Sequence, residues 1–404
     1  MGSPRLLLVT IDRLPAWILP AWGATWVSTP ALDTLAGSGI VLDRLIAPTL
    51  DPRQTLEAIG GGVLAVAAAA GIAPVIVTDD AGFAESAAQA TAGVVTKVVD
   101  AYLPRRAART IEGTNPGRLF AAAREMLTCG DHRFVWVHAG SLALAWDAPE
   151  SFLAPYVDPE DPPPPEGVAV PSLRLGRDHD PDLVVGYRQR FAAQVTLLDR
   201  CIGDFLAALP GATADSSGWT VCLAGVRGMA LGLHGVIGVP GGDGEELPLG
   251  ESIHLPAIFV DARGRMAAQR YAGLVLPADL GATLRGVLAR EEAVPPAPGG
   301  GEPARSLEGL FDGWKHPPRD RVLCVAPAGT AVVTEAWSYV ESTGPDGERS
   351  PRLHAKPDDY FELVDVHSRC PGVVARMAEI AAAARRRDLV AWTMPLGGQG
   401  DEPE

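Results

Sequence analysis

The sequence predicts an α/β protein built around a mainly parallel, doubly wound sheet. Short apolar runs that stop at polar residues recur along the first 290 residues, and segments with helical spacing separate several of them. The runs are Arg5–Ile11, Ile40–Ile46, Ala73–Thr78, Arg133–His138, Thr220–Ala224 and Ile258–Val260. Runs of this kind are typical of strands that are buried on both faces of a sheet. Their alternation with helices favours a doubly wound arrangement.

Three segments between these runs have the pattern of helices. Thr29–Leu35 starts with threonine before proline and ends just before Gly37, which predicts a short helix. Asn115–Leu127 and Asp182–Leu209 place apolar residues at steps of three and four, as amphipathic helices do. Pro155–Pro171 is rich in proline and acidic residues and is therefore expected to be a solvated loop.

A segment rich in proline and glycine, Glu291–Arg305, has the composition of a linker. It divides the chain into a predicted α/β core of residues 1–290 and a C-terminal subdomain of residues 306–404. The elements expected in this subdomain are a small antiparallel sheet and a closing amphipathic helix, at Arg321–Val325, Thr330–Thr334, Trp337–Val340 and Pro371–Arg387.

Composition and charge exclude several classes of protein. Hydrophobic residues make up 47% of the chain and charged residues 21%, which excludes a disordered protein. Thirty-four basic residues against 49 acidic ones give a net charge of −15, so we expect no nucleic-acid partner. No apolar stretch has the length of a membrane span or a signal peptide, and we expect no membrane partner. The five scattered cysteines show no metal-binding spacing and predict reduced thiols in a cytoplasmic protein.

Three places carry residues suited to chemistry. Asp12 ends the first predicted strand, where open α/β sheets bind ligands, although a capping or solvated aspartate has the same pattern. Thr49 and Arg53 precede a predicted helix start, where an anion is stabilised, but a helix cap explains them equally well. The glycine-rich segment Gly225–Gly235 contains His234, and it fits either a ligand-binding loop or a plain loop.

Taken in order, several motifs resemble the sulfatase family of the alkaline phosphatase superfamily along nearly the whole chain. The motifs are LLLVTID, TPALDTLAGSGIVLDRLIAPT, GYRQRFAAQVTLLDRCIGDFL, TVCLAGVRGMALGLHG, HLPAIFV and DDYFELVDVHSRCPGVVARMAEI. The resemblance implies a sulfatase-like α/β core with a small C-terminal subdomain. It also implies that Asp12 stands at a metal-binding position, Thr49 at the position of the nucleophile and Arg53 after it. His234 then lies in the family's late loop, and His138 matches a family histidine loosely.

The cation site departs from the family pattern. The resemblance implies a hard divalent cation, usually calcium, held by two aspartates at the first strand and by Asp-Asn or Asp-His in the late loop. The corresponding pairs here are Asp12-Arg13 and Val226-Arg227. One carboxylate beside a fixed positive charge does not hold calcium. We therefore expect no cofactor, and Ca²⁺ or another divalent cation only if the site is active.

The nucleophile position also departs from the family pattern. The family's Cys/Ser-x-Pro-x-Arg, whose first residue is oxidised to formylglycine, is represented by the segment Thr49–Arg53. Threonine cannot become formylglycine. Without a metal or an identified base, Thr49 keeps the high pKa of an alcohol. The lysines with which the family binds anions are also missing, because the chain has no lysine between Lys97 and Lys315.

Two functions follow from these matches and departures. The first is a sulfatase-family protein with a degenerate site, which does not hydrolyse esters and instead binds a protein partner or a small anionic ligand. The alternative is an active sulfuric- or phosphoric-ester hydrolase that uses Asp12, Thr49, Arg53 and His234, with Thr49 as the nucleophile. In both cases we expect these four residues around one cleft at the carboxyl ends of the strands. We also expect Arg227 to contact Asp12 and replace the lost positive charge.

Overall fold

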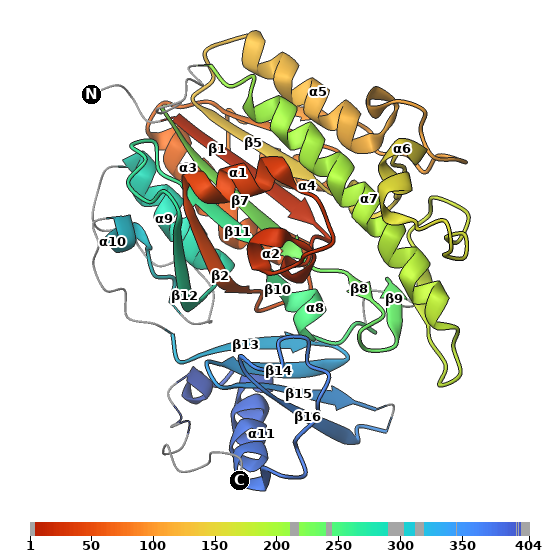
Figure 1. The fold of residues 1–404 in the computed structure, drawn as a ribbon. Coiled ribbons are helices and arrows are strands. Elements are labelled where there is room, and N and C mark those ends of the chain that lie inside the picture. Colours follow the sequence, from red (N-terminus) through yellow and green to blue (C-terminus); the bar gives the residue numbers. More distant parts are fainter. Residues whose placement is uncertain are drawn as a thin grey trace.

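The computed structural model describes residues 5–210, 218–239, 245–289, 303–311, 319–344, 346–392, 394 and 396. Figure 1 shows a large central sheet with helices on both faces and a smaller sheet beside one end of it. The fold class predicted from the sequence is confirmed. Among the described residues, no helix has both the length and the apolarity needed to cross a bilayer.

The central sheet is mixed and mainly parallel. Its strands, in spatial order, are β10 (His254–Leu255), β2 (Ile40–Ile46), β11 (Ala257–Val260), β7 (Trp219–Arg227), β1 (Arg5–Asp12), β5 (Phe134–Ala139), β3 (Pro74–Thr78) and β4 (Val95–Val98), and β12 (Gln269–Val275) pairs with β2. β1 lies between β5 and β7 and is parallel to both. β10 and β11 pair in antiparallel fashion with β2. All six predicted strand segments are present.

Three strands of this sheet were not predicted. β4 escapes a search for apolar runs because all four of its residues are exposed at the sheet edge. β10 has only two residues, and most of β12 is exposed or half-buried. Edge strands bury little surface, so their sequences do not need the apolar pattern that identifies central strands.

Each face of the sheet has its own layer of helices. One layer contains α1 (Pro30–Ser38), α5 (Asn115–Thr128) and α7 (Pro181–Leu206). The other contains α2 (Pro52–Leu56), α3 (Gly62–Ala69), α4 (Ala81–Ala90) and α9 (Pro277–Ala289). Successive residues of β1 point alternately to the two layers, with Leu8 in one core and Val9 in the other. This double burial explains why β1 is apolar along its whole length.

The chain also contains several short elements. They are α6 (Glu150–Leu153), α8 (Gly250–Ile253), α10 (Glu308–Phe311) and a three-stranded sheet of β6 (Ser172–Arg174), β9 (Val236–Gly238) and β8 (Ala230–Leu231). β6 follows the proline-rich segment predicted as a loop. That segment contains no described strand or α-helix apart from a short 3-10 turn and an isolated bridge at Ala169.

The C-terminal sheet is an antiparallel meander covered by one helix. It consists of β13 (Arg321–Ala326), β14 (Gly329–Thr334), β15 (Trp337–Thr343) and β16 (Arg349–Ala355), and α11 (Pro371–Arg385) packs on it. The three predicted strands and the helix are present, and β16 is an additional strand. Val322 and Val333 join the core of the central sheet, whereas Val332 and Tyr339 pack on the side of α11.

The meander is thus held between the larger domain and α11, and it shares a hydrophobic core with that domain. The predicted linker, Glu291–Arg305, lies mostly outside the described residues. The domain boundaries at residues 290 and 306 therefore stay predictions.

A carboxylate from α7 caps the first helix. The side chain of Thr29 precedes α1 but accepts no capping hydrogen bond from it. Instead, Asp199 of α7 accepts hydrogen bonds from the backbone N–H groups of Ala31 and Leu32, at 3.1 and 2.8 Å. Gly203, one turn along α7, lets the two helices approach, because a Cβ there would lie 2.9 Å from the Cβ of Ala31. Asp199, which belongs to the family-like motif GYRQRFAAQVTLLDRCIGDFL, therefore has a structural role.

We expect the Asp199→Ala substitution to lower the free energy of unfolding by about 1–2 kcal/mol, because it leaves two backbone donors at a helix start without their acceptor. Urea denaturation at pH 7 measures the change. Asp204→Ala is the matched control on the same helix, since Asp204 is exposed and its salt-bridge partner in the described part of the chain is Arg200. A loss at Asp204 equal to that at Asp199 would contradict the capping role.

The same residue predicts a pH dependence of stability. Burial raises the pKa of Asp199 to about 6, from an ordinary 3.8. The folded protein therefore holds a proton that the unfolded chain has lost, and this residue's contribution to stability falls as the pH rises from about 4 to about 6. We expect the decline to be smaller in Asp199→Asn, as measured by urea denaturation across that range.

Candidate functional site

A β-bulge between the two central strands sets the geometry of the site. β1 and β7 pair in regular register up to Ile11 and Gly225, and the next pair joins Asp12 to Arg227. Val226 is therefore the extra residue on β7. Its side chain is fully buried in the hydrophobic core. The bulge places Arg227 directly beside Asp12 at the carboxyl ends of both strands.

Asp12 and Arg227 form a two-pronged ion pair. Nε of Arg227 donates to Oδ1 and Oδ2 of Asp12 at 3.0 and 3.3 Å, and one terminal nitrogen donates to Oδ2 at 3.1 Å. The side chains are only 7% and 11% exposed. Both oxygens of the carboxylate are thus engaged by a cation with little access to water. The contact expected between Asp12 and Arg227 is present.

Arg13 points away from this pair into the protein. Its φ of 62° lies in the left-handed region, which is unusual for a residue with a side chain. Its guanidinium donates to both carboxylate oxygens of Glu246, at 2.8 and 2.9 Å, and to the carbonyl of Gly228 at 3.2 Å. The pair is fully buried. No pattern in the sequence points to Glu246 as the partner of Arg13, because 233 positions separate the two residues.

Two further carboxylates lie at the same edge of the sheet, at the end of β3. Asp79 accepts hydrogen bonds from the backbone N–H groups of Gly140 and Ser141, at 2.6 and 3.2 Å. Asp80 caps α4 through the N–H of Phe83. Burial raises the pKa of Asp79 above its ordinary value, against the lowering effect of these hydrogen bonds. Sequence reasoning missed both aspartates, although they follow a predicted strand exactly as Asp12 does.

His138, at the end of β5, lies among these carboxylates. The charges of Asp79, Asp12 and Asp80 all act on it, yet its burial lowers its pKa and favours the neutral ring. The indole of Trp136 donates to the hydroxyl of Thr10 at 2.9 Å, and that hydroxyl lies 3.0 Å from Nδ1 of His138. The hydroxyl can therefore donate its own proton to Nδ1, which leaves the ring proton on Nε2.

Arg53 reaches the same edge from α2. A Cβ added to Gly82 would lie 3.4 Å from a terminal nitrogen of Arg53 and 3.4 Å from a carboxylate oxygen of Asp80, so both side chains approach this glycine. α2 itself packs against β7. Arg53 is exposed, and the structure gives its guanidinium no partner among the described residues. We call the six residues that meet here the strand-end cluster: Asp12, Arg53, Asp79, Asp80, His138 and Arg227.

Thr49 lies in the turn between β2 and α2 and has a structural contact. Its Oγ1 accepts a hydrogen bond from the backbone N–H of Asp51 at 3.1 Å. Asp51 in turn caps α2 through the N–H of Arg53. Among the described residues, no carboxylate or imidazole accepts the proton of the Thr49 hydroxyl. The helix-cap interpretation left open by the sequence accounts for Asp51.

His234 has neighbours different from those expected. Apart from burial, the groups that shift its pKa are Glu362, His354, Arg352 and Asp359, all in the C-terminal part of the chain. Burial is the main cause, and it lowers the pKa. The expectation that His234 shares a cleft with Asp12 and Thr49 is therefore not supported by its surroundings. The glycine-rich loop runs toward the C-terminal sheet, a direction that loop composition does not reveal.

The donors at this site do not fit a calcium ion. Calcium takes six to eight oxygen ligands. At the four positions matched to the family's ligands, Asp12 is engaged by Arg227, Arg13 faces Glu246, and Val226 is apolar. In the described part of the chain, no group of three or more His, Cys, Asp or Glu side chains is arranged to hold a metal ion.

Comparison with known proteins gives a consistent result for the fold. No protein-family model matches the sequence, and a search of curated proteins finds no relative. Solved structures do match. A phosphonate monoester hydrolase of Agrobacterium radiobacter aligns over 95% of this chain and 96% of its own, with a TM-score of 0.71 and 15% identity.

The chain has the sulfatase fold. A phosphonate monoester hydrolase from Silicibacter pomeroyi aligns with a TM-score of 0.67 and 17% identity, over 95% of each chain. A 2-O GAG sulfatase aligns with a TM-score of 0.65 and 15% identity, over 95% of this chain and 92% of its own. The sulfatase fold thus covers both the α/β core and the C-terminal sheet.

We expect the Arg227→Ala substitution to lower the free energy of unfolding by about 3 kcal/mol, because it leaves the carboxylate of Asp12 buried without a partner. Urea denaturation at pH 7 measures this loss. Adding Asp12→Asn to Arg227→Ala should recover part of it, since the uncompensated charge is then gone. The control is Arg200→Ala, which breaks an exposed pair with Asp204 and should leave stability nearly unchanged.

Proposed function

We propose that this chain is a divergent sulfatase-family protein that does not hydrolyse esters and acts by binding. The observation that carries the proposal is the ion pair between Asp12 and Arg227. It puts a fixed guanidinium against the carboxylate that, by the sequence resemblance, would ligate the cation. A protein positive charge thus replaces the ion in the electrostatics of the site.

This replacement preserves the fold but not the chemistry. A bound divalent cation would both activate a nucleophile and neutralise charge on the group being transferred. Arg227 directs Nε and one terminal nitrogen to Asp12, so these donors are not available to a transferring sulfuryl or phosphoryl group. Thr49 donates to no base among the described residues, and the residues at the positions matched to the family's ligands do not fit a calcium ion that would lower its pKa. Both requirements for ester hydrolysis are therefore unmet at these residues.

The binding role rests on the one arginine of the strand-end cluster that is not paired with a carboxylate among the described residues. Arg53 is exposed at the same edge and keeps its guanidinium available for an anionic group. Asp12, Asp79 and Asp80 oppose anion binding, so a small inorganic anion should bind weakly there. A protein partner that presents an acidic side chain would form the same ion pair with Arg53, and its larger contact area would strengthen the binding. A cytoplasmic location, consistent with the five free cysteines, is part of this proposal.

The test is a measurement of metal content and hydrolysis on the same preparation. Protein purified without chelator and dialysed against CaCl₂ should retain well under about one calcium ion per chain by elemental analysis. Hydrolysis of 4-nitrophenyl sulfate, 4-nitrophenyl phosphate and a phenylphosphonate monoester should not exceed that of the Thr49→Ala variant. Adding Mn²⁺, Zn²⁺ or Ca²⁺ should not change this result.

The active-hydrolase alternative makes the opposite forecast. It requires about one tightly held cation per chain and turnover that disappears in Thr49→Ala. The Arg53→Ala variant separates binding from catalysis. Under our proposal it weakens the binding of inorganic sulfate in calorimetry and leaves the background hydrolysis unchanged. Turnover that depends on both Thr49 and a cation would overturn the proposal.

A further inference from the structure

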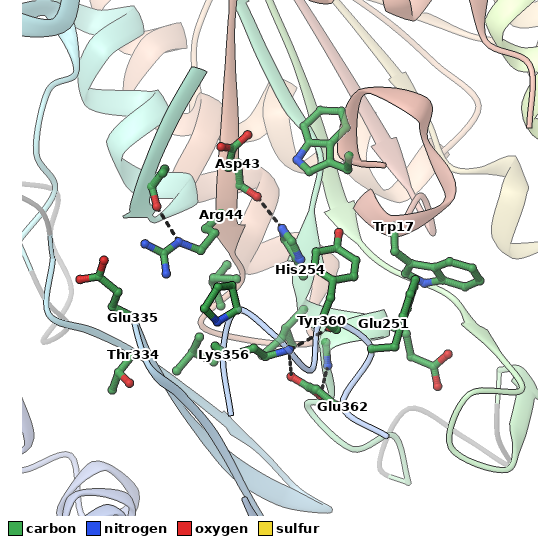
Figure 2. Close-up of a pocket in the computed structure, with 18 of the residues that line it drawn as sticks. Trp17, Asp43, Arg44, Glu251, His254, Thr334, Glu335, Lys356, Tyr360 and Glu362 are labelled. Carbon is green, nitrogen blue, oxygen red and sulfur yellow. Dashed lines mark hydrogen bonds and ion pairs between the residues drawn. The ribbon is translucent and has the colours of Figure 1, made fainter. Parts of the chain in front are cut away.

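A cavity lies where the α/β core meets the C-terminal sheet, and charged side chains on its walls offset one another. Its volume is about 410 Å³. Lys356 binds Glu362 at 3.3 Å. Figure 2 shows Arg44 and Glu335 together on the side of the cavity opposite Trp17. These charges therefore favour neither an anionic nor a cationic ligand.

The open edge of the central sheet differs, because its charges do not offset one another. β4 is the last strand on this side, and among the described residues it pairs only with β3. Within residues 95–109, the basic residues Lys97, Arg105, Arg106 and Arg109 stand against one acidic residue, Asp100. The four basic side chains are exposed, and none has a carboxylate partner in the described part of the chain. This segment thus carries a net charge of +3 in a chain whose net charge is −15.

The same segment exposes apolar side chains. Val95, Val98, Tyr102 and Leu103 have exposed fractions between 37% and 52%. A single exposed apolar residue is ordinary on a protein surface, but four within a stretch this short make a patch that suits a partner. We call residues 95–106 the edge surface. It combines apolar and aromatic contacts with arginine, which is typical of the protein–protein interfaces of globular proteins.

The edge surface is held in place by its contacts with α5. Tyr102 exchanges backbone hydrogen bonds with the side-chain amide of Asn115, at 3.0 and 2.9 Å, and its hydroxyl donates to the carbonyl of Gly113 at 2.7 Å. The guanidinium of Arg118 lies over its ring, 5.1 Å from the centroid. A surface that is already ordered loses little conformational entropy when a partner binds.

The outer side of β4 offers free backbone groups. β4 runs parallel to β3, with Thr78 beside Val98 in the register. The N–H of Val99 donates to the carbonyl of Thr78 at 2.8 Å, so Val99 and the alternate residues before it face β3. Thr96 and Val98 therefore direct their N–H and C=O groups to the open side. An added strand would pair with these groups.

We propose that the edge surface binds an extended, acidic segment of a protein partner, which adds to β4 as a further strand of the central sheet. The backbone of the segment would pair with Thr96 and Val98, and its acidic side chains would meet Lys97, Arg105 and Arg106. Strand addition of this kind takes affinity from main-chain hydrogen bonds and specificity from alternate side chains. The surface lies outside the strand-end cluster, so the proposal does not depend on whether the chain hydrolyses esters.

Charge and backbone geometry distinguish this partner from two others. A second copy of β4 is disfavoured, because antiparallel pairing through Thr96 and Val98 brings two Lys97 side chains together. Nucleic acid lacks the alternating N–H and C=O groups that pair with a strand edge, and the net charge of −15 opposes its approach. An acidic peptide meets both the free backbone groups and the local positive charge.

The test uses the heptapeptide EVEVEVE, which alternates glutamate and valine, as a probe of the full chain. Isothermal titration calorimetry should show that EVEVEVE binds at least about tenfold tighter than KVKVKVK, which has the opposite charge. A version of EVEVEVE with N-methyl groups on its central valine and on the next glutamate keeps its charge but blocks both edges of its backbone. It should bind at least about tenfold more weakly.

Variants of the chain locate the binding. Arg105→Glu combined with Arg106→Glu should weaken EVEVEVE at least about tenfold. The matched control is Arg386→Glu combined with Arg387→Glu, because these two arginines are also adjacent and exposed and their replacement changes the net charge equally. Lys97→Glu should weaken the peptide about twofold to fivefold.

Amide hydrogen exchange, measured by NMR, tests the strand pairing directly. Saturating EVEVEVE should slow the exchange of the Thr96 and Val98 amides at least about tenfold, and it should change the Lys97 amide little, because that amide already faces β3. Binding of EVEVEVE without slower exchange at Thr96 and Val98 would refute strand addition.

Three other results would also refute the proposal. Equal affinity for EVEVEVE and KVKVKVK would exclude an acidic partner, and an equal loss in both double-arginine variants would show that only the net charge matters. Binding of a short DNA duplex or of phosphatidylserine vesicles that is lost in the Arg105 and Arg106 variant, without binding of EVEVEVE, would assign the surface to another class of partner. The Arg53→Ala variant should bind EVEVEVE normally, which separates this surface from the strand-end cluster.

Discussion

The bulge that sets Arg227 beside Asp12 is the constraint on which the rest of the site depends. β1 and β7 are central strands, and their carboxyl ends lie where a doubly wound sheet gathers its functional groups. A carboxylate buried there without a counter-charge would be strongly unfavourable. One extra residue on β7, Val226, turns the next side chain toward Asp12 and provides that counter-charge. The insertion fills the core with an isopropyl group and the polar edge with a guanidinium.

The residues next to the Asp12–Arg227 pair have partners of their own. Arg13 would bring a second positive charge to the same edge, but its left-handed backbone turns it inward to Glu246. Each arginine therefore has its own carboxylate, and the two pairs are separate. Asp79 is held by backbone N–H groups of the loop after β5, which orders that loop without a metal. Asp12 and Asp79 are thus both held by protein groups, a guanidinium for Asp12 and backbone N–H groups for Asp79.

The strand-end cluster and the cavity at the C-terminal sheet differ in their chemistry. The cluster is polar, with three carboxylates against two guanidinium groups. Asp12 pairs with Arg227, whereas Asp79 and Asp80 accept hydrogen bonds from backbone N–H groups. The cavity, of about 410 Å³, is lined mainly by aromatic and aliphatic side chains, among them Trp17, Tyr360 and Phe361.

The sequence by itself determined the fold class, the central strands and the exchange of cation ligands for Arg13, Val226 and Arg227. These features follow from residue types at single positions. A strand that is buried on both faces must be apolar throughout, and a basic or apolar residue at a position where a carboxylate ligand is expected can be recognised without the structure. It also led to the contact between Asp12 and Arg227, because the sulfatase-family resemblance placed both residues at cation-ligand positions. The edge strands were not predicted from the sequence, because strands with exposed residues do not need to be apolar.

Only the tertiary structure decided the partners of the remaining polar residues. Glu246 meets Arg13 across 233 positions, His234 is directed to the C-terminal sheet, and Asp79 joins His138. The cavity is formed by segments between Trp17 and Glu362, none of which signals a site alone. The physical reason is that hydrogen bonds and ion pairs depend on positions within a few ångströms. Those positions are fixed by the packing of distant segments, which no local pattern encodes.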